Sequence, residues 1–250
     1  MQNKFDLADA CRKAIHPLLL KAMPGRRNFP IKVLNSMPEI EGNKLFAINH
    51  SCINDMPVVS EVVIEHVYPL VGKQRLELID RIFFFLNGVV FVDRKSKKNK
   101  GKSLRRMLKI LREGKNLAIF PEGTWNMTPS KSVLPLNWGI IELAKQTGVP
   151  IIPLILEYHP DCCYAKYGDA IYIDTNADKL KEIEKLEDAM ATLKWDIWEM
   201  FPVVTRTDEM KEEFEQMIQQ RIDAYPKLDV EYELSVVRGR ENSPEYVLGR

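Results

Sequence analysis

The chain is poor in cysteine and in net charge, and each shortage excludes a class of protein. Its four cysteines, Cys11, Cys52, Cys162 and Cys163, include no C-x-x-C pair. Neither a disulfide framework nor a zinc site is therefore predicted, and a reducing compartment is the default expectation. The formal net charge is +1, so no overall field draws the chain to nucleic acid or to a membrane. Any electrostatic preference must come from local clusters of charge.

Long apolar segments are also missing. The most apolar run, IFFFLNGVVFV at 82–92, contains an Asn-Gly pair and is well short of the roughly 20 residues that a membrane-spanning helix needs. The N-terminal apolar patch is interrupted by His16 and Pro17, unlike the apolar region of a signal peptide. We therefore expect neither a spanning helix nor a secretory signal.

The apolar residues that are present follow the rhythm of an α/β protein. The 250 residues are 45% hydrophobic and 28% charged, which is enough for one sizeable core. Short apolar runs alternate with amphipathic segments, which predicts a mostly parallel central sheet flanked by helices. Strands are expected at 45–49, 67–72, 89–92, 116–120, 149–157 and 170–174, and helices at 57–66, 75–86, 103–114, 138–148, 177–201 and 207–224. The expected layout is an N-terminal helical region at 1–30, one domain at 31–224 and a polar tail at 225–250.

The stretch NHSCINDMP, 49–57, places a histidine five positions before an aspartate. On one continuous helix the side chains of His50 and Asp55 would diverge by about 140°, but a strand-loop-helix pattern supplies a loop that folds back. A carboxylate is favoured in the first turn of a helix. If it holds one imidazole nitrogen, the other nitrogen is left to accept a proton from an alcohol. The alternative is a polar turn in which an Asn or Asp caps the helix.

Two other predicted strands end in polar groups. FPEGT at 120–124 puts Glu122 and the permissive Gly123 after one strand, and Arg94 lies just past the end of another. Because the carboxyl ends of parallel strands line one crevice, we expect His50, Arg94 and Glu122 to converge there.

The segments NHSCIND, GVVFVDR, FPEGT and VPIIPLIL, in this order and with these separations, resemble the four sequence blocks of the glycerophospholipid acyltransferase family. That family is typified by 1-acylglycerol-3-phosphate acyltransferases. The resemblance covers about residues 40–200, and FPEGT beside an H-x4-D motif is its specific part. It implies a glycerol-3-phosphate acyltransferase-like α/β fold. The implied reaction moves a fatty acyl group from acyl-CoA or an acyl carrier protein to a lysolipid hydroxyl, in phospholipid biosynthesis, without a metal or other cofactor.

Carried over by position, the resemblance also implies roles for single residues. His50 would be the general base and Asp55 the acid that orients it. Glu122 and Gly123 match acceptor-site residues, and backbone donors near Gly123 would stabilise the oxyanion of the tetrahedral intermediate. Arg94 matches the cation that meets the acceptor's phosphate, with a bidentate and permanently charged guanidinium.

The chain departs from the family pattern directly after Thr124. The family block usually continues FPEGTR, whereas Trp125 stands here, and LNWG at 136–139 occupies a place where a lysine is common. Two acceptor-side cations are therefore absent, although Lys131 would be able to substitute from the loop. We expect Thr124 and Trp125 to contact the substrate. The tryptophan would favour an apolar or less charged acceptor, or pack against the acyl chain.

Three further segments have more than one interpretation. The densely cationic 94–109 is either a solvated helix face or a docking surface for anionic lipid headgroups or an acidic acyl carrier. Without a recognisable motif or interleaved aromatics, it is not expected to bind nucleic acid. IFFFL at 82–86 is expected to pack in the core. Because three adjacent phenylalanines of one helix cannot all face inward, some of them would face a membrane interface or the acyl chain. HPDCC at 159–163 fits no standard metal spacing and is expected to be a loop.

Two functions from different classes follow. The first is a peripheral membrane acyltransferase, cytoplasmic and at the inner face of the cell membrane, which uses His50 as its base. The second is a non-catalytic peripheral lipid- or acyl-carrier-binding protein on the same scaffold, in which Trp125 marks a changed site. Thioester turnover separates the two.

Overall fold

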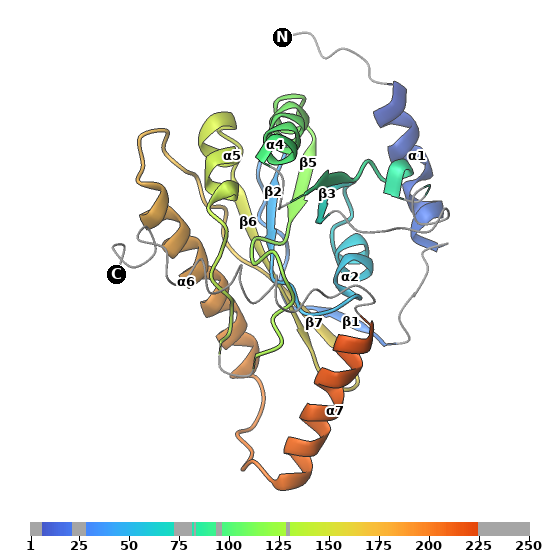
Figure 1. The fold of residues 1–250 in the computed structure, drawn as a ribbon, viewed down its shortest axis with the longest axis vertical. Helices are drawn as coiled ribbons and strands as arrows, with labels where there is room; N and C mark the ends of the chain where they lie inside the picture. The colour runs from blue at the N-terminus through green and yellow to red at the C-terminus, as the bar shows by residue number, and fades with distance from the viewer. Residues whose placement is uncertain are drawn as a thin grey trace.

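A seven-stranded sheet forms the centre of the molecule, with helices packed on both faces (Figure 1). The computed structural model describes residues 7–21, 29–72, 82, 84–93, 97–128 and 131–224. The strands are β1 (Ile31–Val33), β2 (Leu45–Ile48), β3 (Val67–Gly72), β4 (Val90–Val92), β5 (Asn116–Ile119), β6 (Ile151–Tyr158) and β7 (Cys163–Tyr167). Their order is β1-β7-β6-β2-β5-β3-β4, and every neighbouring pair is parallel except β6 with β7. The predicted α/β class with a mostly parallel sheet is confirmed.

The helices cover this sheet from segments before, between and after its strands. They are α1 (Leu7–Lys21), α2 (Asp55–Val62), α4 (Lys97–Arg112), α5 (Gly139–Thr147), α6 (Lys179–Trp198) and α7 (Asp208–Ala224). Helix α4 begins at Lys97, which is six residues before the start at 103 that the sequence pattern predicts. Its first turns are rich in lysine, and a turn that faces solvent needs no apolar period. Most of the helix predicted at 75–86 lies outside the described residues, although 84–86 are helical.

Strand β2 is buried on both faces and anchors the core. Leu45 and Ala47 belong to the apolar cluster formed with α4, α5 and α6, whereas Phe46 and Ile48 belong to the cluster formed with α2. This alternation follows from the period of two along a strand. All four side chains are 0% exposed, as expected for a parallel strand between two helical layers. The residue that follows such a strand is held in a fixed place, and here it begins the candidate site.

The prediction of a strand at 170–174 is wrong. Within it only Ile171 pairs, through an isolated bridge to Ile151, and Tyr172 is exposed. The strand lies earlier, at β7, whose side chains alternate between buried and half-buried positions. A tight turn brings β7 back against β6, so HPDCC is a hairpin connection whose last cysteine already belongs to the strand. The sequence pattern also missed β1, a three-residue edge strand with little burial.

Candidate active site

The loop between β2 and α2 brings His50 and Asp55 into direct contact. His50 Nδ1 lies 2.6 Å from Asp55 Oδ2. The loop folds back because Asp55 is the first residue of α2, and its side chain turns toward the preceding backbone to accept from the N–H groups of Ser51, at 2.6 Å, and Cys52, at 3.0 Å. The predicted meeting of histidine and aspartate is therefore present, in the strand-loop-helix setting that the sequence indicated.

The carboxylate of Asp55 is completely enclosed and accepts a further hydrogen bond from Tyr158. Its side chain is 0% exposed, and the Tyr158 hydroxyl donates to Oδ1 at 2.8 Å. Burial, together with the charge of Asp55, raises the pKa of Tyr158 well above its usual value, so this hydroxyl keeps its proton. Because an ionised carboxylate only accepts, the His50 hydrogen lies on Nδ1. The lone pair of Nε2 is then left as a proton acceptor.

Two aromatic rings fix the plane of the imidazole. Phe120 stacks on His50 with centroids 4.3 Å apart and an interplanar angle of 23°. Trp125 meets His50 edge to face at 5.9 Å. The side chain of His50 still has 22% of its surface exposed, so a substrate can reach the ring. The His50 ring is thus contacted by Asp55, Phe120 and Trp125 and is open on the rest of its surface.

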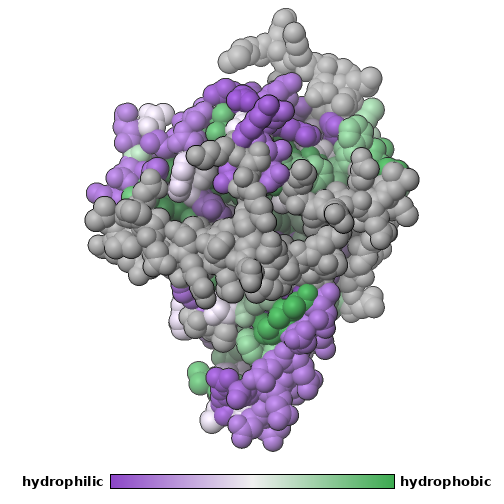
Figure 2. Space-filling model, viewed as in Figure 1, coloured by the Kyte–Doolittle hydropathy of each residue, from purple (hydrophilic) through white to green (hydrophobic). Residues whose placement is uncertain are grey.

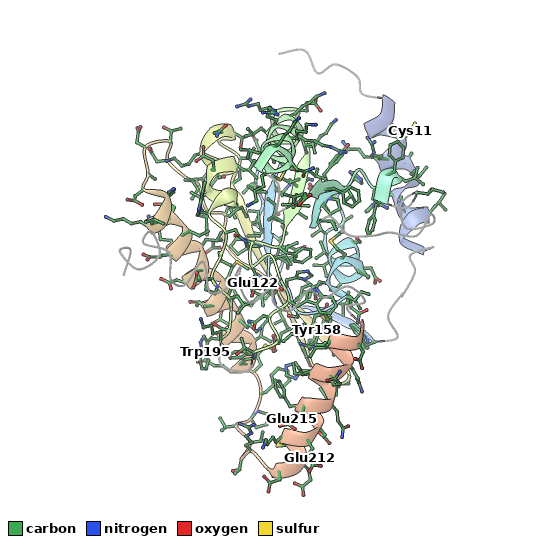
Figure 3. The ribbon with its side chains drawn as sticks, in the orientation of Figure 1. Cys11, Glu122, Tyr158, Trp195, Glu212 and Glu215 are labelled. Carbon is green, nitrogen blue, oxygen red and sulfur yellow. The ribbon has the colours of Figure 1, made fainter. Side chains whose placement is uncertain are left out.

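Glu122 is buried beneath the site and binds backbone N–H groups of two segments. Its side chain is 0% exposed and accepts from the His50 N–H and from the Leu134 N–H, each at 2.8 Å. Burial raises the pKa of this carboxyl to about 7, although both backbone donors oppose the shift. Figure 3 labels Glu122 and Tyr158 near the middle of the molecule, where the strands end. In this geometry Glu122 joins the His50 loop to the segment around Leu134, a contact that the resemblance did not predict.

Gly123 turns the chain after β5. Its φ of +73° lies in the left-handed region, which glycine enters at little cost. The Gly123 N–H donates to the Phe120 carbonyl at 3.0 Å. That donor therefore closes the turn and does not point at a reacting oxygen in this conformation.

Thr124 and Trp125 are each only 7% exposed. They line the buried side of the turn, and Trp125 reaches His50 with its ring. The next residue, Asn126, donates its backbone N–H to the His50 carbonyl at 2.7 Å. Trp125 therefore forms a wall of the candidate site beside the His50 ring.

Leu136 and Asn137 stand where the family often has a lysine, and both have structural contacts in this chain. Leu136 is 6% exposed and belongs to the core. Asn137 binds the Pro121 carbonyl through both its backbone N–H and its side-chain amide, each at 2.8 Å. Lys131 is exposed, and its backbone carbonyl accepts from the Asn126 side chain at 3.0 Å. Arg94 lies outside the described residues, so its convergence with His50 and Glu122 stays a prediction.

Tyr158, Phe120 and Asn49 have site contacts that the sequence analysis does not predict, although Asn49 and Phe120 stand at the starts of the two motifs. Asn49 extends the pairing of β2 with β6, because its side-chain amide donates to the Leu156 carbonyl at 2.9 Å and accepts from the Leu156 N–H at 2.7 Å. Tyr158 is the last residue of β6, so its position at a carboxyl strand end was the one available signal.

Within the described residues, His, Cys, Asp and Glu side chains form no group of three placed to hold a metal ion. Among the described helices, none has the length and apolar content to cross a membrane.

The chain matches a known protein family and several of its members. The model of the family described as Acyltransferase matches residues 26–157. A 1-acyl-sn-glycerol-3-phosphate acyltransferase of Borreliella burgdorferi is 29% identical over 156 residues, which cover 58% of this chain and 61% of that protein. One from Saccharomyces cerevisiae is 32% identical over 87 residues, covering 34% of this chain and 29% of that protein. The matched segment thus spans less than two thirds of either relative's length.

A solved structure shares the fold. The crystal structure of the 1-acyl-sn-glycerophosphate (LPA) acyltransferase from Thermotoga maritima aligns with a TM-score of 0.59 and 18% sequence identity. The alignment covers 80% of this chain and 83% of that one. The matched family segment contains His50, Asp55, Glu122 and Trp125, and it ends one residue before Tyr158.

Proposed function

Because the chain belongs to the Acyltransferase family, we propose that it transfers a fatty acyl group from a thioester to the hydroxyl of a lysolipid of the 1-acylglycerol-3-phosphate class. The observation that carries the proposal is the 2.6 Å contact between His50 Nδ1 and the buried Asp55 carboxylate. The similarity of the chain to 1-acyl-sn-glycerol-3-phosphate acyltransferases supports the substrate class.

The proposed reaction uses the free nitrogen of His50 as a general base. Nε2 takes the proton of the acceptor hydroxyl while the oxygen attacks the thioester carbonyl carbon, and a C–O bond forms. The tetrahedral intermediate collapses with cleavage of the C–S bond, and the imidazolium returns its proton to the leaving thiolate. Asp55 stabilises the positive charge that the ring carries between these steps. No metal or other cofactor is required, because the acyl group arrives already activated as a thioester.

The donor is coenzyme A or an acyl carrier protein, and the acceptor reaches the site from a membrane surface to which the protein binds peripherally, at the inner face. Arg94 is proposed to meet the acceptor's phosphate, and Thr124 and Trp125 to contact the rest of the acceptor. Glu122 acts on the acceptor site indirectly, since its carboxylate binds two backbone N–H groups.

The test is turnover by purified protein with acyl-CoA and acyl carrier protein donors and a panel of lysolipids, with products read by mass spectrometry. His50→Ala should lower kcat by about 10²- to 10⁴-fold and leave the circular dichroism spectrum unchanged. His159→Ala is the control for loss of an imidazole, because the His159 ring stacks on Phe201 and not on His50. Lysolipid or carrier binding without turnover by the wild-type chain would instead support a non-catalytic binding protein.

A further inference from the structure

Helix α4 presents a stripe of cations to solvent. We call this the cationic stripe; its members are all exposed and are Lys98, Lys102, Arg105, Arg106, Lys109 and Arg112. At about 100° per residue, the six positions fall within about 120° of the helix circumference. The opposite side of α4 is buried through Ser103, Met107, Leu108, Ile110 and Leu111. Figure 2 shows hydrophilic side chains gathered on the upper surface, where Figure 1 places α4.

Within the described residues, little acidic charge opposes the stripe. The helix contains no acidic residue. Among the described parts of the chain, its one ion pair joins Lys109 to Glu113, at 3.7 Å and with both side chains exposed. Like charges four residues apart, as at Lys102 and Arg106, destabilise a helix by a few tenths of a kcal/mol per pair. Folding stability therefore does not account for the stripe, and its chemistry fits an anionic partner.

The partner is one that binds by charge without inserting apolar groups. No residue of the described part of α4 is among the exposed large hydrophobic side chains. A helix that lies in a bilayer surface buries an apolar face there, but the apolar face of α4 is already packed against the sheet. Purely electrostatic docking gives fast association and release, which suits a soluble partner that leaves after each turnover.

The stripe begins close to the edge of the sheet that carries the candidate site. Asn99 Oδ1, in the first turn of α4, accepts from the Asp93 N–H at 2.8 Å, directly after β4. In the sheet order β4 lies three places from β2, or about 14 Å at the usual strand spacing. A partner docked on α4 would therefore need an extended arm to bring a thioester to His50.

We propose that the cationic stripe of α4 docks an acidic acyl carrier protein, whose prosthetic arm delivers the acyl thioester to His50. The inference rests on the proposed acyl transfer and specifies its donor. Coenzyme A carries the same phosphopantetheine arm, so its phosphates could contact part of a cationic surface three strands away, but so small a molecule cannot span the whole stripe. An acidic protein face, in contrast, matches a stripe that extends about 21 Å from Lys98 to Arg112.

The experiment compares a charge-reversed stripe with a matched reversal elsewhere. Lys102→Glu/Arg106→Glu changes two exposed cations four residues apart on α4, and Lys181→Glu/Lys185→Glu does the same on α6. Each protein is assayed with a palmitoyl acyl carrier protein, palmitoyl-CoA and palmitoyl-pantetheine, which has no phosphate. We expect the α4 variant to lose about tenfold or more in kcat/KM with the carrier, mainly through KM. Activity with palmitoyl-pantetheine should not change, and the α6 variant should match the wild type.

Titration with the unacylated carrier protein measures docking without turnover. Carrier affinity should fall in the α4 variant, and wild-type affinity should fall between about 0.05 and 0.3 M salt, as screening shortens the range of the charges. Equal losses with palmitoyl-CoA and the carrier would overturn the proposal in favour of a coenzyme site. Unchanged carrier affinity, or a loss confined to binding of phosphatidylglycerol vesicles, would overturn it as well. If the wild type turns over none of the donors, the proposed function fails and the titration alone decides the docking.

Discussion

At the scale of single residues, the orientation of the His50 ring depends on a side chain from a distant part of the chain. Oδ2 of Asp55 accepts hydrogen bonds from the His50 ring and from two backbone N–H groups, while Oδ1 accepts one from the Tyr158 hydroxyl. A carboxylate with partners on both oxygens is unable to rotate without leaving a buried donor unpaired, which costs about 1–3 kcal/mol. We therefore infer that Tyr158 positions His50 through Asp55.

Tyr158→Phe tests this role. The variant removes the donor to Oδ1 and keeps the ring, so Asp55 gains freedom to turn. We expect kcat to fall by about tenfold, which corresponds to about 1.4 kcal/mol, with little change in KM for the acceptor. Tyr172→Phe is the control, because Tyr172 is 66% exposed. If steady-state kinetics show the same kcat for Tyr158→Phe and wild type, Tyr158 does not position the base.

Trp125 offers a second residue-scale prediction. Trp125→Arg restores the residue that the family block usually carries, next to His50. We expect the ratio of kcat/KM for 1-acylglycerol-3-phosphate over 1-acylglycerol to rise, since a guanidinium binds phosphate. Because the position is 7% exposed, the variant should also unfold at a lower temperature. Trp125→Phe controls for loss of the indole, and an unchanged acceptor ratio in Trp125→Arg would exclude Trp125 from the headgroup site.

At the scale of elements, Glu122 connects three parts of the chain around the site. It follows β5, binds the first residues after β2 through the His50 N–H, and binds the segment before α5 through the Leu134 N–H. The folded state therefore contains a buried carboxyl whose pKa, at about 7, is above its ordinary value of 4.5. A raised carboxyl pKa means that the folded chain binds more protons than the unfolded chain between these two values, so stability falls as pH rises through that window.

Glu122→Gln should remove this dependence. The free energy of unfolding of the variant, relative to wild type, should increase from pH 4.5 to pH 7 by up to about 3 kcal/mol and then level off. Urea unfolding across this pH range measures the difference. Glu184→Gln, at an exposed position of α6, is the control. A difference between Glu122→Gln and wild type that stays constant with pH would contradict the proposed titration of Glu122.

At the scale of the whole molecule, local patterns predicted the elements but not the contacts between distant ones. The fold-back of Asp55 onto His50 was accessible from sequence because five residues and one loop contain it. The contacts of Tyr158 and Phe120 were not accessible, because a local sequence pattern does not predict which strand end lies beside which loop. The false strand at 170–174 has the same cause, since an apolar alternation fits a strand whether or not a neighbouring edge is free to pair with it.

A long-range ion pair joins helix α6 to strand β6 near the candidate site. Lys194 of α6, with a side chain only 9% exposed, lies 3.3 Å from Glu157 of β6. Glu157 also accepts from the Trp198 indole N–H at 2.9 Å. The charge of Lys194 additionally lowers the pKa of Glu122, against the larger effect of burial. A buried pair of this kind is costly to break from one side only.

Lys194→Met and Glu157→Gln should therefore be strongly non-additive. Lys194→Met alone leaves a half-enclosed carboxylate without its cation, and we expect a loss of about 3 kcal/mol in the free energy of unfolding. Lys194→Met/Glu157→Gln should recover much of that loss, because neither charge then remains to be desolvated. Urea unfolding at pH 7 of the four proteins in this cycle measures the coupling. Additive losses would mean that the two charges act independently.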